Sequence, residues 1–257
     1  ISLLYYSDRL MEFPLGLFGI ALATVTLPYL ARQAANDSLD EFADTLDWSM
    51  TLVLLIAVPA AIGLIVLAEP LVATIFYGGV FTGDDVRMTA LALQAFSVGL
   101  IGFSYVKILA PAYFAREDTR TPVRIGLIAL AVNFVLSVSL AWYLTRIGFA
   151  GTHAGLALAI SVAALLNAFL LYRGLRREGV VRHGRGWAAL LFRTAVANIF
   201  MTAALVALQR PLSWWLESGI FDRVTWLAMA IVVAVAAYFA ALFVLGMRTA
   251  DFRLRQN

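Results

Sequence analysis

The sequence has 257 residues, of which 62% are hydrophobic and 14% are charged. A soluble domain has about 25% charged and roughly 45–50% apolar residues, and the apolar residues here are gathered in long blocks, so the composition indicates a membrane protein. The sequence contains no cysteine, which excludes disulfides and thiolate metal sites. The two histidines, His153 and His183, stand far apart in loop-like sequence, so we expect no metal site and no cofactor.

The apolar blocks predict an all-α, polytopic membrane protein with about seven spanning helices, because about twenty apolar residues cross a hydrocarbon core about 30 Å thick. The predicted spans are residues 3–31, 48–68, 88–113, 123–145, 152–172, 187–208 and 224–247. Between the second and third spans, the chain is half apolar and half turn-like. This stretch predicts either an extension of the second span followed by a loop, or a short helix at the membrane interface.

Basic residues are distributed unequally between alternate loops. Thirteen lie on one side and four on the other, and such an excess marks the cytoplasmic side. The predicted cytoplasmic set is Arg32, Arg116, Arg120, Arg124, Arg173, Arg176, Arg177, Arg182, Arg185, Arg193, Arg248, Arg253 and Arg255, and the opposite set is Arg87, Arg146, Arg210 and Arg223. We therefore expect a cytoplasmic C-terminus. Seven spans then place the start of the chain outside, which suits a segment that follows an odd number of earlier spans.

The start of the chain does not have the pattern of a signal peptide. It begins with Ile1, and no charged region with a short apolar stretch and a cleavage site follows. We expect the N-terminal part of a longer protein to precede it.

Three charged residues lie near the start of the first span, in the stretch YYSDRLMEFP. Ionisable residues inside a span cost a few kcal/mol each near the centre, so they suggest function by default. Arg9 and Glu12 are one helical turn apart and can form an ion pair, with Asp8 beside them. Arginine suits phosphate, because its planar fork of donors stays charged. The competing interpretation is an interfacial ion pair that only fixes the depth of the helix.

Pro14, Gly16 and Gly19 follow these charges and predict a hinge. Proline removes a backbone donor and bends a helix, and glycine lets neighbouring helices approach closely. A bent helix that carries an arginine predicts a water-filled cavity. Lys107, one turn before Pro111 in the third span, is interpreted as a side chain that reaches the cytoplasmic interface.

No motif in the sequence predicts catalysis. There is no Ser-His-Asp set, no paired carboxylates inside a cavity, and no glycine loop in the strand–helix context that a nucleotide site needs. We therefore expect a transporter rather than an enzyme, with no nucleic-acid partner.

Four stretches closely resemble the MurJ (MviN) family of lipid II flippases, within the multidrug/oligosaccharidyl-lipid/polysaccharide exporter superfamily. They are YYSDRLMEFPLGLFGIALATVTLPYLAR, FYGGVFT, AFSVGLIGFSYVKILAPAYFAREDTRTPV and GLALAISVAALLNAFLLY. The resemblance implies the C-terminal half of a fourteen-helix, two-lobe transporter. Residues 1–176 would form five helices of the C-terminal lobe. Residues 177–257 would form two further helices with a groove for a lipid tail, followed by a cytoplasmic tail.

The resemblance also implies a function. The family moves the lipid-linked peptidoglycan precursor, lipid II, from the cytoplasmic to the periplasmic leaflet of the bacterial inner membrane by alternating access, for cell-wall synthesis and cell shape. Arg9 would contact the diphosphate of this undecaprenyl-linked disaccharide-pentapeptide, Glu12 would be its partner, and Asp8 would lie beside the site. The implied partners are lipid II, membrane lipids and an N-terminal lobe of the same protein.

Three alternatives remain open. One is a flippase for another polyprenyl-diphosphate-linked saccharide, for which the chemistry of Arg9 would be the same. Another is a membrane scaffold that recruits cell-wall enzymes through its basic loops and tolerates loss of Arg9. The last is a cation-coupled drug antiporter, which needs an acidic residue deep in a span, and this sequence offers only Glu12.

Overall fold

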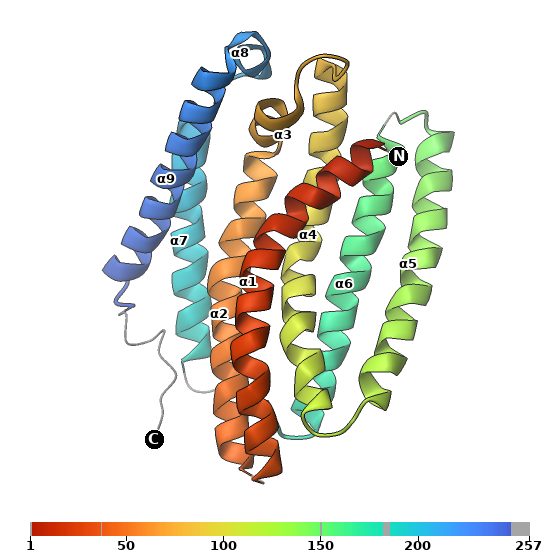
Figure 1. Ribbon diagram of the computed structural model, residues 1–257, viewed down its shortest axis with the longest axis vertical. Coiled ribbons are helices and arrows are strands. Elements are labelled where there is room, and N and C mark those ends of the chain that lie inside the picture. The colour runs from red at the N-terminus through yellow and green to blue at the C-terminus, as the bar shows by residue number, and fades with distance from the viewer. Residues whose placement is uncertain (1, 37, 150, 182–185, 248–257) are drawn as a thin grey trace.

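The computed structural model describes residues 2–36, 38–149, 151–181 and 186–247, which form nine helices (Figure 1). The helices are α1 (Ser2–Ala35), α2 (Leu39–Val66), α3 (Ala68–Phe76), α4 (Gly83–Phe114), α5 (Arg120–Arg146), α6 (Thr152–Arg177), α7 (Trp187–Ala207), α8 (Leu212–Glu217) and α9 (Ile220–Val244). The seven long helices coincide with the seven predicted spans, and successive long helices run in opposite directions.

Six of these helices are long and apolar enough to cross a membrane: α2, α4, α5, α6, α7 and α9. The chain is therefore a multi-pass helical membrane protein. α1 has 34 residues but is not among the six. Its first half carries Asp8, Arg9 and Glu12, and a seventh crossing by this helix stays a prediction.

Several boundaries differ from those predicted. α2 begins at Leu39, nine residues before the predicted start, because its acidic first turns resemble a loop in sequence. Asp40 and Glu41 in the first turn suit the positive end of the helix dipole. The stretch after α2 forms a short helix, α3, which is one of the two predicted alternatives, and a break at Leu67 separates it from α2. Helix α8 was not predicted. His153 lies in the first turn of α6 rather than in a loop, whereas His183 is outside the described residues.

Helix α4 lies at the centre of the bundle and packs against α6, α1 and α2. Its contact with α6 is close because glycines face small residues. A Cβ atom added to Gly102 would lie 2.6 Å from the backbone nitrogen of Leu165, and one added to Gly99 would lie 2.6 Å from the Ser161 hydroxyl. The Ser161 hydroxyl donates to the carbonyl oxygen of Ala95 in α4 (2.7 Å). Such close backbone approach is the usual basis of helix association in membranes.

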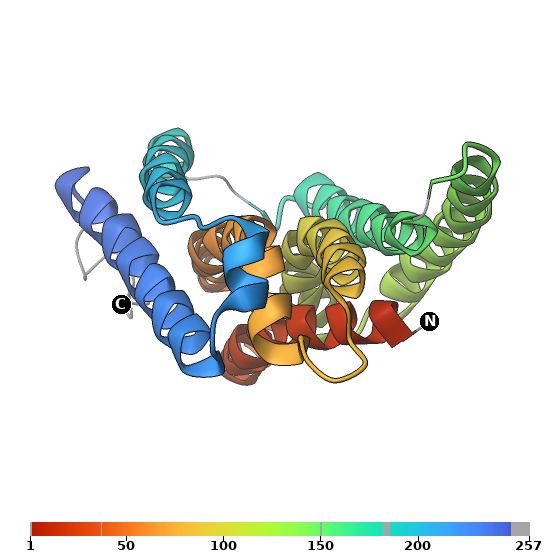
Figure 2. The ribbon, with the colours of Figure 1, turned by 90° about the horizontal axis from the view of Figure 1, so that it is seen from above.

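Helix α5 lies at one edge of the bundle, and α7 and α9 lie at the other, as Figure 2 shows from above. α5 packs almost entirely on α6, and its other faces are exposed. On the other side, α7 and α9 pack on each other and reach the rest of the molecule mainly through α2 and α3. The hydroxyl of Tyr238 in α9 donates to the carbonyl oxygen of Leu55 in α2 (2.9 Å), which fixes α9 to the core.

A buried arginine ties the start of α9 to α3 and α8. Arg223 is only 7% exposed, and its two terminal nitrogens donate to the carbonyl oxygens of Ala73 (3.3 Å) and Leu216 (3.0 Å). Its guanidinium also lies over the Tyr77 ring, 4.9 Å from the centroid. Although sequence placed this residue in an outer loop, its side chain belongs to the packed end of the bundle.

The described arginines of the predicted cytoplasmic set lie near helix ends that meet at one end of the bundle, the lower end in Figure 1. They are Arg32, Arg116, Arg120, Arg124, Arg173, Arg176, Arg177 and Arg193, whereas Arg182, Arg185, Arg248, Arg253 and Arg255 lie outside the described residues.

Candidate functional site

The predicted ion pair on α1 is formed. Nη1 of Arg9 lies 2.8 Å from Oε2 of Glu12, one helical turn away. Both side chains are exposed, by 58% for Arg9 and 49% for Glu12. The guanidinium also lies over the Tyr5 ring, 5.0 Å from its centroid, a cation–π contact that fixes its orientation further. The charge is therefore held in place on a surface that a ligand can reach.

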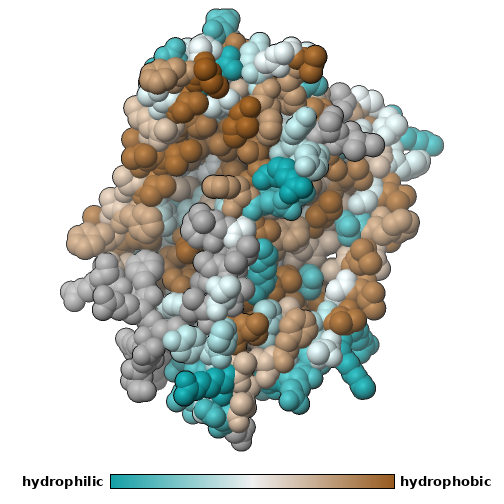
Figure 3. Space-filling view, in the orientation of Figure 1, coloured by the Kyte–Doolittle hydropathy of each residue, from teal (hydrophilic) through white to brown (hydrophobic). Residues whose placement is uncertain are grey.

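The packing of α1 on α4 turns this pair away from the protein core. Ser7 and Met11 are buried on the face toward the bundle, and the Ser7 hydroxyl donates to the carbonyl oxygen of Thr89 in α4 (2.9 Å). Arg9 and Glu12 project from the other side of the helix, beside Phe13, which is 75% exposed. Figure 3 shows a hydrophilic area interrupting the hydrophobic surface on the face over which α1 runs.

Asp8 is half-buried at the edge of this surface, and the ion-pair partner of Arg9 is Glu12 rather than Asp8. Pro14, Gly16 and Gly19 all lie inside α1, which stays helical through Pro14. α1 is bent, so that its first part leans toward α6 while its second part runs beside α2 (Figure 1). A Cβ atom added to Gly16 would meet no atom within 4 Å, so this glycine is not required by a close contact in the present conformation.

Lys107 makes a contact that was not predicted from the sequence. Its Nζ in α4 donates a long hydrogen bond to the carbonyl oxygen of Leu15 in α1 (3.4 Å). The half-buried side chain thus reaches across to α1 directly after Pro14, rather than toward the end of the bundle. A backbone carbonyl has no signature in sequence, so periodicity and charge alone offered no signal for this pairing.

An apolar cavity of about 680 Å³ lies between α2 and α7. Leu54, Val58 and Ile62 of α2 face Leu191, Ile199 and Ala203 of α7 across it. Two buried polar residues of α7 also line it, and the Asn198 side-chain nitrogen donates to the carbonyl oxygen of Thr194 (2.7 Å). α7 and α9 pack on each other, and the cavity opens on the α2 side of α7. The groove for a lipid tail that the last two helices were expected to form stays a prediction.

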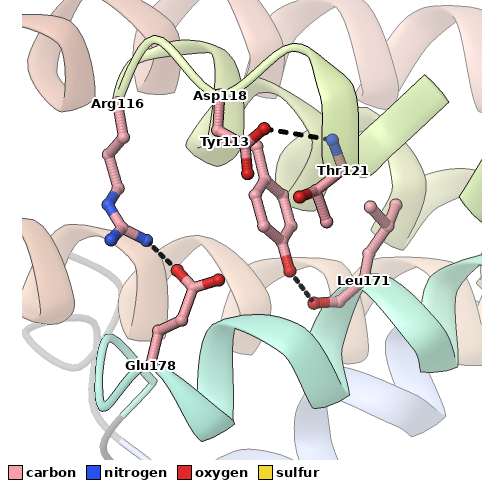
Figure 4. Close-up of polar contacts among 6 residues, drawn as sticks. All are labelled: Tyr113, Arg116, Asp118, Thr121, Leu171 and Glu178. Carbon is pink, nitrogen blue, oxygen red and sulfur yellow. Dashed lines mark hydrogen bonds and ion pairs between the residues drawn. The ribbon is translucent and has the colours of Figure 1, made fainter. Parts of the chain in front are cut away.

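Polar contacts fix the connection between α4 and α5 to the end of α6 (Figure 4). The Tyr113 hydroxyl donates to the carbonyl oxygen of Leu171 (3.0 Å), and Arg116 forms an ion pair with Glu178. Asp118 accepts hydrogen bonds from the backbone nitrogens of Thr121 (3.0 Å) and Arg120 (3.1 Å) at the start of α5. The hydrogen bonds from Thr121, and then from Arg120, lower the pKa of the Asp118 carboxyl below its ordinary value.

The sequence and the fold were compared with those of known proteins. A family model described as "Lipid II flippase MurJ" matches residues 1–225. A probable lipid II flippase MurJ of Vibrio cholerae is 45% identical over 98% of this chain and 47% of its own length. The lipid II flippase MurJ of Burkholderia cenocepacia is 36% identical over 99% of this chain and 48% of its own length.

A solved structure of lipid II flippase MurJ in an inward closed conformation matches with a TM-score of 0.75. The match covers 95% of this chain and 46% of that chain, with 21% identity, so it bears on the fold alone. The chain spans about half the length of the curated relatives it matches. With a family model matching residues 1–225, the chain belongs to the MurJ family of lipid II flippases.

Proposed function

We propose that this chain acts in moving lipid II from the cytoplasmic to the periplasmic leaflet of the bacterial inner membrane, with its C-terminus in the cytoplasm. It does so together with a preceding lobe, such as the one that makes up the other half of its relatives. The observation that carries the proposal is the exposed guanidinium of Arg9, held by Glu12 on α1, in a member of this family.

Arg9 has the chemistry that the diphosphate of lipid II requires. A guanidinium offers five N–H donors in a rigid fork that matches phosphate oxygens, and it remains charged at every relevant pH. The contact with Glu12 engages Nη1, so the remaining donors can meet a phosphate without complete loss of the pair. Glu12 keeps the guanidinium oriented. Because the pair is neutral, Asp8 makes the net charge of the three side chains negative, which favours release of the transported lipid.

The bend of α1 supplies the movement that alternating access needs. Pro14 removes a helical hydrogen bond, and Gly16 has free space around it, so the first part of α1 can change its angle at low cost. Gly19 lies one turn further and extends the same hinge. A change of angle there would move Arg9 relative to the rest of the bundle.

The lipid chain of the substrate lies along the last two helices in this proposal. We assign residues 1–176 to the lobe that carries Arg9, and this assignment is supported by α7 and α9, which pack mainly on each other at its side. The apolar cavity between α2 and α7 offers a surface without charge for an isoprenoid chain. Burial of such a chain is favourable in proportion to the apolar area that it covers.

The test is rescue of bacteria depleted of their own lipid II flippase by a full-length protein that contains this chain. We expect wild type to rescue growth and Arg9→Ala to fail at equal membrane abundance. Rescue by both proteins would indicate that Arg9 is a structural anchor and not a binding residue. Failure of both would favour a flippase for another polyprenyl-linked saccharide or a scaffold, which transport assays with other diphosphate lipids would separate.

A further inference from the structure

An aromatic cluster connects the start of α1 to the turn between α3 and α4. The centroid of the Tyr6 ring lies 4.7 Å from that of Phe76 and 5.8 Å from that of Phe81. The two phenylalanine rings lie 6.1 Å apart, so the three rings form one cluster. Rings at such separations attract one another beyond the effect of their buried area. Tyr6 lies about two helical turns before Pro14, so the cluster holds the part of α1 that precedes the bend.

The turn that carries Phe81 has a closely defined backbone. Gly78 and Gly79 have φ angles of 146° and 58°, which favour glycine, and the backbone nitrogen of Phe81 donates to the Gly78 carbonyl oxygen (3.1 Å). Thr82 and Asp85 then form a capping box at the start of α4, in which the Thr82 backbone nitrogen donates to the Asp85 carboxylate (2.8 Å). The turn therefore offers the Tyr6 ring a fixed surface.

Helix α9 holds the other side of this turn. The guanidinium of Arg223 lies over the Tyr77 ring and donates to the carbonyl oxygen of Ala73 in the last turn of α3. A cation is favourable there, because the C-terminal carbonyls of a helix carry partial negative charge. The end of α3 is thus attached to α9, so the rings of Phe76 and Phe81 stay in place if α1 moves.

The two halves of α1 are held to the bundle in different ways. After the bend, Thr26 shares a hydrogen bond with Ser49 of α2 (3.0 Å), and the Gln33 side-chain nitrogen donates to the Thr45 hydroxyl (2.9 Å). Before the bend, the Ser7 hydroxyl donates to a carbonyl oxygen of α4, and the aromatic cluster adds to this contact. Because proline interrupts the helical hydrogen bonds between the halves, the first half can detach while the second stays on α2.

We propose that Tyr6, Phe76 and Phe81 form a latch, which holds the first part of α1 on the bundle and opens when the helix changes its angle at Pro14. This inference rests on the proposed function, which assigns a hinge to α1. Both ring contacts of Tyr6 must be lost before this part of the helix can leave. The latch therefore keeps the detached state a minor one until other contacts stabilise it.

The test measures how fast a buried thiol on each half of α1 reacts with N-ethylmaleimide in the full-length protein in lipid nanodiscs. This chain has no cysteine, so an introduced thiol is the only one in this half of the protein. Met11→Cys places it before the bend and Leu30→Cys after it, at positions that are 3% and 0% exposed. Each is combined with Tyr6→Leu, with Phe81→Leu, or with both. Phe134→Leu is the matched control, because Phe134 is exposed on α5 and lies outside the cluster.

We expect Tyr6→Leu to raise the reaction rate at position 11 on the order of tenfold, because two ring contacts are lost, and to leave position 30 unchanged. Phe81→Leu should raise the rate at position 11 less, because the Phe76 contact remains. The double variant should react about as fast as Tyr6→Leu alone, since Phe81 acts through the Tyr6 ring. Phe134→Leu should change neither rate.

An unchanged rate at position 11 in Tyr6→Leu would overturn the latch. An equal rise at position 30 would also overturn it, because the whole helix would then have loosened. The reaction with N-ethylmaleimide requires no lipid II. A protein that does not transport lipid II therefore overturns the proposed function, whereas the reaction rates alone decide whether the latch exists.

Discussion

The hydroxyl group of Tyr113 in α4 occupies the space that a side chain at Gly174 in α6 would need. The same hydroxyl donates to the carbonyl oxygen of Leu171, one turn earlier in α6 (Figure 4). At this end, α4 and α6 therefore approach closely because the Tyr113 hydroxyl fits over Gly174. This contact lies close to the ion pair between Arg116 and Glu178.

A double-mutant cycle tests this match. We expect Gly174→Ala to destabilise the protein by about 2 kcal/mol, because the new methyl group collides with the Tyr113 hydroxyl. Tyr113→Phe should cost about 1 kcal/mol for the lost hydrogen bond. In the Tyr113→Phe background, Gly174→Ala should cost less than about 1 kcal/mol. The melting temperatures of all four proteins are measured in one detergent. If the effects of the two substitutions were additive, the proposed contact between Tyr113 and position 174 would be contradicted.

Alanine substitutions at two glycines should change the stability of the protein in opposite directions, because only one of these glycines lies where α4 and α6 approach closely. Gly102→Ala places a methyl group against the backbone of Ala164 and Leu165, which cannot move aside, so we expect a loss of about 1–3 kcal/mol. Gly126→Ala in α5 meets no atom within 4 Å and should stabilise the helix by about 0.5–1 kcal/mol. Thermal unfolding of the two variants is the measurement, and equal effects would disprove the difference in packing.

The hydrogen bonds that Asp118 accepts at the start of α5 predict that the stability of the protein depends on pH. The pKa of Asp118 is lower in the folded protein than its ordinary value of about 3.9, so its stabilising effect is fully present above that pH. The effect is lost as the pH falls through the lowered pKa of the folded state. We expect wild type to have a higher melting temperature than Asp118→Ala at pH 7 and pH 5. The difference between the two melting temperatures should shrink as the pH falls further. Both proteins keep Glu178, so a gap that stays constant with pH would rule out this role.

The pair on α1 should matter for transport and not for stability. Arg9→Lys keeps the charge but loses the planar fork, so we expect transport of lipid II to fall on the order of tenfold. Glu12→Gln frees the guanidinium and should strengthen retention of diphosphate lipids while slowing their release. Exposed ion pairs contribute little to folding, so melting temperatures should remain those of wild type. A large loss of stability in either variant would show that the pair is structural.

The cavity between α2 and α7 predicts that a large side chain in its wall hinders binding of the lipid chain. Ala203→Trp fills part of the cavity wall, so we expect reduced transport with normal membrane abundance. Ala131→Trp on α5 is the control, because this residue is exposed and lies apart from the cavity and from the last two helices. Photocrosslinking of a polyprenyl probe should label residues near Ala203 in wild type and not in Ala203→Trp. Equal transport by both variants would contradict the placement of the chain.

Features that depend on near neighbours in sequence were predictable. The seven long helices follow from apolar length, and the pair of Arg9 and Glu12 follows from a spacing of three residues. Contacts between distant parts of the chain were not predictable. Trp187 donates to Asp47 (2.7 Å) across 140 residues of sequence, so one carboxylate of the acidic part of α2 has a partner that the sequence did not reveal. Lys107 and the Leu15 carbonyl are 92 residues apart, and the packing of α1 on α4 brings them together.

The exposure of α5 means that its position depends on the thickness of the surrounding hydrocarbon. Only 6% of its most apolar stretch is buried inside the chain, against 56% for α4. Side chains such as Leu127, Leu130 and Phe134 are exposed on α5, where α4 has other helices as neighbours. A hydrophobic helix tilts when the bilayer around it becomes thinner. The tilt of α5 would then pull on the connection held by Asp118, so a change of lipid composition would be transmitted to the C-terminal end of α4 through a single turn of the chain.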